Sequence, residues 1–248
     1  MVLMVFKSKI IGDILGKKIS KKLNKIYQYA LFKEFVEEIE NQTVKIFPVG
    51  SIEYRDNGRT VFIDHETGQD ERDVYFRYIN EKIIGNNPID FLEFGVHEGK
   101  GINFWASINQ HPNSRFYGFD SFEGLPEDWT AKAPKGTFNV NGKLPEIKDN
   151  RIRFVKGMFH KTLPDFLSSY KTKNRLVIHF DADLYSSTVF VLFNLSHILG
   201  SGSVLMFDEF ITYFDEFLAF HDFTRCCYKK WNVICRRRDF RRIAIELK

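Results

Sequence analysis

The sequence predicts an α/β fold in which a mainly parallel sheet carries helices on both faces. Short apolar segments alternate with helical segments from residue 90 to the end of the chain. Strands and helices in alternation form parallel sheets through right-handed crossovers. The first apolar segment also breaks into a glycine-rich turn at residues 95–101. Such a turn, placed before a helix, leaves room for a ligand against bare backbone.

The composition predicts one domain with a substantial core. A chain of 248 residues with 44% apolar residues can bury such a core. Residues 1–33 hold eight lysines against Asp13 alone, about +7, while the whole chain carries +4. The remainder is therefore near neutral, which argues against a nucleic-acid partner. Three cysteines without metal-binding spacing, and the lack of a signal peptide or membrane span, predict a soluble, cytoplasmic protein.

Residues 1–68 are predicted to form an N-terminal extension. Apolar residues at helical spacing, with lysines mostly between them, predict an amphipathic helix over residues 8–40. Residues 8–33 would contact an anionic membrane surface or a partner, or the helix would pack on the body with its lysines in solvent. Both interpretations stay open. The rest of the extension looks irregular, with a turn at Asn57-Gly58 between two short strand-like segments.

Residues 69–248 are predicted to form the main domain. A helix begins near residue 69 and ends at the segment 85–88, which contains glycine and proline. The strand candidates are residues 90–94, 115–119, 152–155, 175–180, 203–207, 232–235 and 242–247, and the helical segments between them are about 100–110, 161–170, 187–199 and 215–229. The basic turn 236–239 predicts a closing hairpin. Residues 121–150 form a long insertion that reads as a lid or binding loop.

Ligands of parallel sheets bind beyond the carboxyl ends of the strands, so residues at those ends are candidates for a site. The first strand ends in Glu93, and Gly95 and Gly99 follow it. Asp120 ends the second strand, 25 positions after Gly95. A ribose-binding acid is expected at about that distance. The alternative is that Asp120 caps a helix or turn.

Two acid clusters follow the fourth and fifth strands of this domain. Asp181 and Asp183 come after one strand, and Asp208 and Glu209 after the next. Carboxylates that converge at one sheet edge repel one another unless a cation or protons compensate. Their oxygen atoms suit a hard divalent ion, Mg²⁺ above all. The alternative, that these acids cap the following helices, suits Asp183 but leaves Asp208 and Glu209 unexplained.

Two histidines in this part of the chain have different expected roles. His160 follows the third strand at the same edge and would be a base, a substrate contact or simply a helix N-terminal residue. His179 lies within a strand, which favours a buried core position.

With these motifs in this order, the chain resembles the macrocin O-methyltransferase family. The motifs are Glu93-Phe94-Gly95-Val96, Phe119-Asp120-Ser121-Phe122-Glu123-Gly124-Leu125-Pro126, Gly157-Met158-Phe159, Asp181-Ala182-Asp183-Leu184-Tyr185-Ser186-Ser187-Thr188 and Phe207-Asp208-Glu209-Phe210. The similarity covers about residues 70–235. It implies a Rossmann-like class I methyltransferase sheet of seven strands with an antiparallel last strand. It also implies S-adenosylmethionine and Mg²⁺ as cofactors and a sugar or other polyol hydroxyl as acceptor.

The resemblance also implies a role for each matching residue. Gly95 and Gly99, with Glu93 before them, would hold the methionine moiety of S-adenosylmethionine. Asp120 would hold the ribose, and Ser121 and Phe122 the adenosine region. The metal ligands would be Asp181, Asp208 and Glu209, although the family commonly has two aspartates where this chain has Asp208-Glu209. Asp181 or His160 would accept the proton of the acceptor hydroxyl.

Three alternatives remain beside a methyltransferase that acts on a small molecule or glycan. A nicotinamide oxidoreductase is disfavoured because the turn lacks Gly-x-Gly-x-x-Gly. A sugar-nucleotide glycosyltransferase would use Asp181 and Asp183 for a metal, but the acid pair on the next strand and the early glycine turn argue against it. The third is a non-catalytic membrane-surface protein. The oligomeric state is open, with a homo-oligomer among the alternatives.

Overall fold

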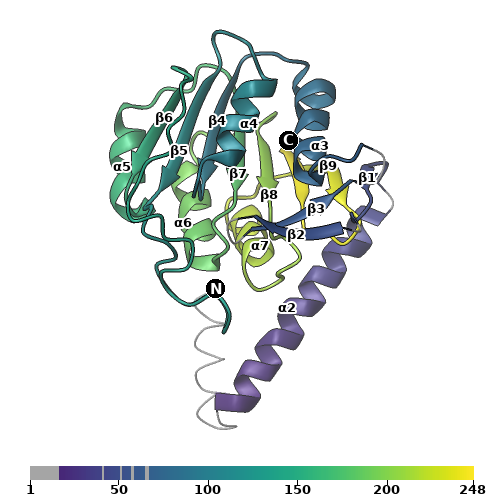
Figure 1. The fold of residues 1–248 in the computed structure, drawn as a ribbon. Helices are drawn as coiled ribbons and strands as arrows, with labels where there is room; N and C mark the ends of the chain where they lie inside the picture. The colour runs from purple at the N-terminus through teal and green to yellow at the C-terminus, as the bar shows by residue number, and fades with distance from the viewer. Residues whose placement is uncertain (1–16, 41, 51, 57–58, 65–66) are drawn as a thin grey trace.

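The computed structural model describes residues 17–40, 42–50, 52–56, 59–64 and 67–248. Over these residues the main sheet has eight strands, in the order β1-β9-β10-β8-β7-β4-β5-β6 (Figure 1). The strands are β1 Lys45–Phe47, β4 Ile89–Phe94, β5 Arg115–Asp120, β6 Ile152–Lys156, β7 Arg175–Phe180, β8 Val204–Phe207, β9 Trp231–Arg237 and β10 Ile243–Leu247. All seven predicted strands are present, so the α/β class is confirmed.

The last strand, β10, is antiparallel to both of its neighbours, β8 and β9. The other pairings in the sheet are parallel. The predicted antiparallel last strand is therefore confirmed. The predicted number of seven strands is one too few for the described sheet, because β1 pairs with β9 at its edge. β1 belongs to this sheet although it precedes residue 69.

Helices cover both faces of the sheet (Figure 1). α3 Glu71–Tyr78, the π-helix η1 Ile79–Ile84 and α4 Lys100–Ile108 pack on one face. α5 Phe159–Ser169, α6 Tyr185–Leu195, α7 Glu216–Cys226 and the C-terminal part of α2 Lys17–Glu40 pack on the other. Side chains of a strand alternate between its faces, so Phe91 faces α4 while Leu92 and Phe94 face the second layer. Every residue of β4 is buried, as expected for a central strand.

α2 confirms the predicted N-terminal helix over residues 17–40; residues 8–16 lie outside the described part of the chain. Phe32 and Phe35 of α2 pack on α7, with ring centroids 5.0 and 5.5 Å from that of Phe217. Ile26 and Tyr27, nearer the start of the helix, are exposed. The C-terminal part of the helix is thus anchored to the body by aromatic contacts.

β2 Ile52–Asp56 and β3 Arg59–Ile63 form a separate antiparallel pair. This pairing agrees with the predicted hairpin, whose turn at Asn57-Gly58 lies outside the described residues. None of the described helices combines the length and apolar character that crossing a bilayer requires.

Candidate active site

A cavity of about 650 Å³ opens at the carboxyl edge of the sheet. It brings together the residues that follow β4, β5, β6, β7 and β8, as expected for a parallel sheet. Its walls include Gly95, His97, Asp120, Ser121, Gly157, His160, Asp181, Asp183, Asp208 and Glu209, together with Arg72, Arg241, Arg242 and residues of the insertion such as Trp129 and Phe138. Most of the predicted residues therefore share one site.

The glycine turn after β4 forms one wall of this cavity. Gly95 has a φ of 93°, and a Cβ there would collide with the backbone carbonyl of Asp181. Glycine is therefore required for β4 and β7 to approach each other at this point. Gly99 also has a positive φ, and a Cβ there would lie 2.8 Å from the side chain of Pro145. Gly99 thus gives room to the insertion, and it is not among the residues that line the cavity.

Asp120, at the end of β5, holds the glycine turn in place. Its Oδ2 accepts hydrogen bonds from the backbone N–H groups of Val96 and His97, both at 2.8 Å. Its Oδ1 accepts one from Phe122 N–H at 2.7 Å. A carboxylate offers about four acceptor positions, so Asp120 keeps capacity for a ligand hydroxyl.

Ser121 and Phe122 follow Asp120 but point in different directions. Ser121 lines the cavity, where its hydroxyl accepts a hydrogen bond from Glu123 N–H at 3.1 Å. Phe122 is fully buried against Phe154, with ring centroids 6.1 Å apart. Its aromatic ring therefore belongs to the core, which is a correction to its predicted contact with the adenosine region.

Glu93 also faces the interior rather than the main cavity. Its Oε2 accepts a hydrogen bond from Ile102 N–H at 3.1 Å, and its Oε1 lies 2.9 Å from His179 Nδ1. Both side chains are almost completely buried. Glu93 therefore connects β4 to β7 and to the start of α4. It also borders a smaller cavity beside the glycine turn, so its role beside the cofactor stays a prediction. The core position predicted for His179 is confirmed.

Four carboxylates, those of Asp181, Asp183, Asp208 and Glu209, form another part of the cavity wall. Burial, followed by the negative charge of Asp208, raises the pKa of Asp181 to about 6. Burial and Asp208 likewise raise the pKa of Glu209 to about 7. Asp183 has a pKa well above its ordinary value because it is buried beside Asp181. Three carboxylates in this wall are thus incompletely compensated.

Asp208 is the exception because an arginine pairs with it. Burial alone would raise its pKa, but the charge and hydrogen bond of Arg242 hold it below the ordinary value. Arg242 Nε donates to Asp208 Oδ1 at 2.6 Å. The weaker pairings are Arg72 with Asp181 at 3.4 Å and Arg241 with Glu209 at 3.5 Å.

The carboxylate oxygens of this wall are chemically suited to bind a hard divalent cation. All of the facing acid groups offer oxygen atoms, the ligands that Mg²⁺ prefers, and a cation would relieve their repulsion. In the part of the chain that the structure describes, no three His, Cys, Asp or Glu side chains are gathered as metal ligands. Asp208 faces Arg242, so it would have to share its carboxylate between arginine and ion.

His160 lies in the first turn of α5 and is exposed at the cavity. Three positions earlier, the N–H of Gly157 donates a hydrogen bond of 2.8 Å to the backbone carbonyl of Asp120. The loop after β6 is thereby fixed against β5. His160 lines the cavity from the helix that follows this loop.

The insertion 121–150 covers part of the cavity. Trp129 Nε1 donates to Asp215 Oδ2 at 3.0 Å, which ties the insertion to the start of α7. Phe138 lies against His97, with ring centroids 5.9 Å apart. The insertion therefore adds aromatic surface to the site.

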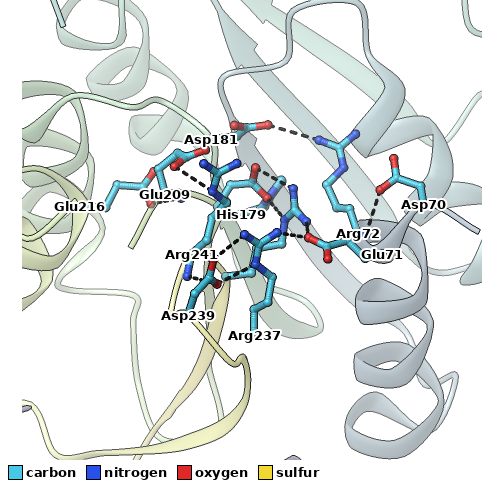
Figure 2. Close-up of polar contacts among 12 residues, drawn as sticks. Asp70, Glu71, Arg72, His179, Asp181, Glu209, Glu216, Arg237, Asp239 and Arg241 are labelled. Carbon is cyan, nitrogen blue, oxygen red and sulfur yellow. Dashed lines mark hydrogen bonds and ion pairs between the residues drawn. The ribbon is translucent and has the colours of Figure 1, made fainter. Parts of the chain in front are cut away.

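The arginines of the site were missed by the sequence analysis. Figure 2 shows Arg72, Arg237 and Arg241 converging with Glu71, Asp181 and Glu209. Glu71 accepts hydrogen bonds from Arg237 and, at 2.8 Å, from Arg242. A charged turn such as residues 236–239 normally predicts solvent exposure, so the sequence does not indicate that Arg237 is buried. The pairing of Glu71 with β9 and β10 spans more than 160 positions, and no local pattern reveals it.

Comparison with known families gives a match over most of the chain. Residues 7–228 match the model of the macrocin O-methyltransferase family.

Two curated relatives have similar sequences. One is 8-demethyl-8-(2,3-dimethoxy-alpha-L-rhamnosyl)-tetracenomycin-C 4'-O-methyltransferase of Streptomyces olivaceus, 28% identical over 155 residues, which are 54% of this chain and 58% of that protein. The other is demethyldecarbamoylnovobiocin O-methyltransferase of Streptomyces niveus, 28% identical over 152 residues, 53% of this chain and 56% of that protein. The chain thus matches little more than half the length of each relative.

Two solved structures share the fold. A calicheamicin methyltransferase has a TM-score of 0.59 at 21% identity, over 71% of this chain and 78% of that one. The O-methyltransferase NovP has a TM-score of 0.57 at 23% identity, over 71% and 79% of the two chains. These similarities confirm the predicted Rossmann-like methyltransferase fold.

Proposed function

Because the chain belongs to the macrocin O-methyltransferase family, we propose that it transfers a methyl group from S-adenosylmethionine to a hydroxyl of a sugar or other polyol. One observation carries this proposal: the glycine turn, Asp120 and the carboxylates of Asp181, Asp208 and Glu209 line a single cavity. The backbone of Asp181 packs directly on Gly95. A donor on the turn would therefore lie beside an acceptor on the acids.

The donor half of the proposed site comprises Gly95, His97, Asp120 and Ser121. Asp120 would accept hydrogen bonds from the ribose hydroxyls with the acceptor positions that its backbone partners leave open. Ser121 would contact the adenosine. The backbone at Gly95 and His97 would support the methionine moiety, where the missing side chain permits close approach. S-adenosylmethionine supplies an electrophilic methyl group on sulfur.

The acceptor half comprises Asp181, Asp208 and Glu209, which would hold Mg²⁺. When bound, the ion makes a coordinated hydroxyl more acidic and orients it. The chain would contribute mainly position, because two adjacent oxygens of a polyol held on this wall leave one aimed at the donor half. Asp181 and His160 are the two candidates for accepting the proton.

The proposed acceptor is a small molecule or glycan. Both curated relatives are named as O-methyltransferases, one of them for a rhamnosyl-bearing substrate. The cavity has the size and the mixed aromatic and polar walls of small-molecule sites. Trp129 and Phe138 come from the insertion 121–150, which we propose acts as a lid over the acceptor.

The N-terminal helix supports a second, separate proposal. Residues 8–33 would bring the protein to an anionic surface through their lysines, while Phe32 and Phe35 remain packed on the body. Flotation with anionic vesicles tests this contact. A variant with glutamine at positions 17, 18, 21, 22 and 25 should lose binding, and equal flotation of both proteins would contradict it.

Calorimetry and product analysis together test the proposed function. S-adenosylhomocysteine should bind and NAD should not, which separates a methyltransferase from a nicotinamide oxidoreductase. Incubation with S-adenosylmethionine, Mg²⁺ and a panel of glycans and nucleotide sugars should give an acceptor heavier by one methylene unit. Transfer of a glycosyl group instead would favour the glycosyltransferase alternative. Binding of NAD without S-adenosylhomocysteine would overturn the proposal.

A further inference from the structure

Arg72 is a buried cation with too few partners. It is the second residue of α3, and its side chain is 5% exposed. Its Nη1 lies 3.4 Å from Asp181 Oδ2, and its guanidinium lies 5.7 Å from the ring centroid of Phe76. Within the described residues, its Nε has no hydrogen-bond partner. Burying a charge costs free energy unless the charge is well paired, so an additional anion bound at Arg72 would be stabilising.

The neighbouring arginines show what a satisfied buried cation looks like in this fold. Arg242 is also 5% exposed, but it bonds Asp208 at 2.6 Å and Glu71 at 2.8 Å. Arg237 pairs with both Glu71 and Asp239. Figure 2 shows Arg72 beside this network, with its guanidinium directed to Asp181. Of the three arginines Arg72, Arg237 and Arg242, only Arg72 has an Nε without a hydrogen-bond partner among the described residues.

Arg72 also lies between two spaces. It lines the main cavity, and it lines a smaller one of about 50 Å³ bounded by the glycine turn and the start of α4. His97 and Asp181 border both spaces as well. α4 begins after Gly99, which has no side chain to cap it, so its positive dipole end faces the same region. Glu93, which also borders the smaller space, accepts one N–H of this first turn, that of Ile102. Lys100 borders the smaller space too, paired with Glu98 at 3.3 Å.

We propose that Arg72 binds the carboxylate at the methionine end of the methyl donor, an inference that rests on the proposed function. With the ribose at Asp120 and the methionine moiety along the turn at Gly95 and His97, the donor carboxylate would lie toward the smaller cavity. The guanidinium fork would give it two parallel hydrogen bonds, one of them from the unpartnered Nε. Arg72 would then no longer depend on Asp181, which would face the acceptor.

Calorimetry with two ligands isolates this contact. S-adenosylhomocysteine carries the carboxylate, and S-adenosyl-3-thiopropylamine is the same molecule without it. We expect Arg72→Met to weaken binding of S-adenosylhomocysteine by about 10- to 100-fold, the range for a hydrogen-bonded charge pair, and to leave binding of the decarboxylated ligand within about twofold. Arg77→Met is the matched control, because Arg77 is exposed on the same helix and outside both cavities.

The outcomes separate this inference from the proposed function. If Arg72→Met loses affinity for both ligands equally, or for neither, the role of Arg72 is overturned while the proposed methyl-donor site still stands. Failure of the wild-type protein to bind S-adenosylhomocysteine would overturn the proposed function itself. If Arg72→Met does not fold, Arg72→Lys takes its place, and it should weaken binding of S-adenosylhomocysteine more than binding of the decarboxylated ligand, because it loses the two parallel hydrogen bonds of the guanidinium. Arg72→Lys should lie between wild type and Arg72→Met.

Discussion

Arg242 Nε donates a hydrogen bond of 2.6 Å to Asp208 Oδ1, and both side chains are buried. The pair joins the start of β10 to the end of β8 at the edge of the sheet where the cavity opens. Arg242 is held in turn by Glu71 of α3 at 2.8 Å. The direction of the Asp208 carboxylate is thus set by a chain of buried charges that reaches a helix on one face of the sheet.

Removing the charge of Glu71 should destabilise the fold. Glu71→Gln leaves Arg237 and Arg242 buried without one of their carboxylates, and we expect a loss of about 3 kcal/mol in the free energy of unfolding. Urea denaturation measures it. Glu81→Gln, at an exposed position of η1, is the control and should change the value by less than about 0.5 kcal/mol. Equal stability of the two variants would contradict the account of this network.

Asp120 should be needed for binding of the methyl donor. In Asp120→Asn, one of the two oxygens that bond the turn and the ribose becomes a donor, so we expect affinity for S-adenosylhomocysteine to fall by about 10- to 100-fold. Calorimetry measures the loss. Asp165→Asn, at an exposed position of α5, serves as the control. Unchanged affinity in Asp120→Asn would remove Asp120 from the proposed site.

Asp90 should contribute pH-dependent stability at the opposite edge of the sheet. Burial alone would raise its pKa, but hydrogen bonds from Arg115, from the N–H of Lys173 and from Tyr170 lower it below the ordinary value. A depressed folded-state pKa means that this stability is complete above the unfolded pKa of about 3.9 and is lost as the pH falls through the folded-state pKa.

The variant Asp90→Asn tests this direction of the change in stability with pH. We expect it to lose about 3–5 kcal/mol of unfolding free energy at pH 7, with a difference from wild type that shrinks below about pH 4. Denaturation at several pH values measures the curve. A difference that stays constant, or grows toward acid pH, would show that Asp90 does not act through its charge.

His160 should be the less important of the two candidate bases. Asp181 adjoins Gly95 through its backbone, whereas His160 is exposed on α5. We therefore expect His160→Gln to reduce kcat by less than about tenfold, well short of the 10²- to 10⁴-fold typical of a lost general base. Steady-state kinetics measures it, with exposed His197→Gln as the control. A loss of about 10³-fold would instead assign the proton to His160.

The strands and the location of the site were predictable because their signals are local. Apolar runs such as 175–180 end at acids or glycines, and the carboxyl ends of parallel strands must meet at one edge. The family itself follows from the order of the motifs, and the match over residues 7–228 confirms it. β1 was missed because three residues, Lys45–Phe47, are too few to show a period.

The other differences between the predicted and the observed side-chain positions depend on tertiary contacts. Glu93 and Phe122 stand at ligand-facing positions in the sequence motifs, yet they point inward, to His179 and to Phe154. Arg72 lies in a charged segment that reads as solvated, but α3 packs on the sheet and buries it. Where a long side chain points is decided by partners distant in sequence, and these are invisible to a periodic pattern.

The most direct test of the account is transfer of a labelled methyl group from S-adenosylmethionine to a sugar acceptor, measured with Mg²⁺ and again in excess chelator, beside calorimetry of S-adenosylhomocysteine under both conditions. We expect methyl incorporation that needs Mg²⁺, together with S-adenosylhomocysteine binding that the chelator leaves unchanged. Full incorporation in excess chelator would contradict the role of Asp181, Asp208 and Glu209 as metal ligands. A protein that binds no S-adenosylhomocysteine and methylates no sugar would contradict the proposed function as a whole.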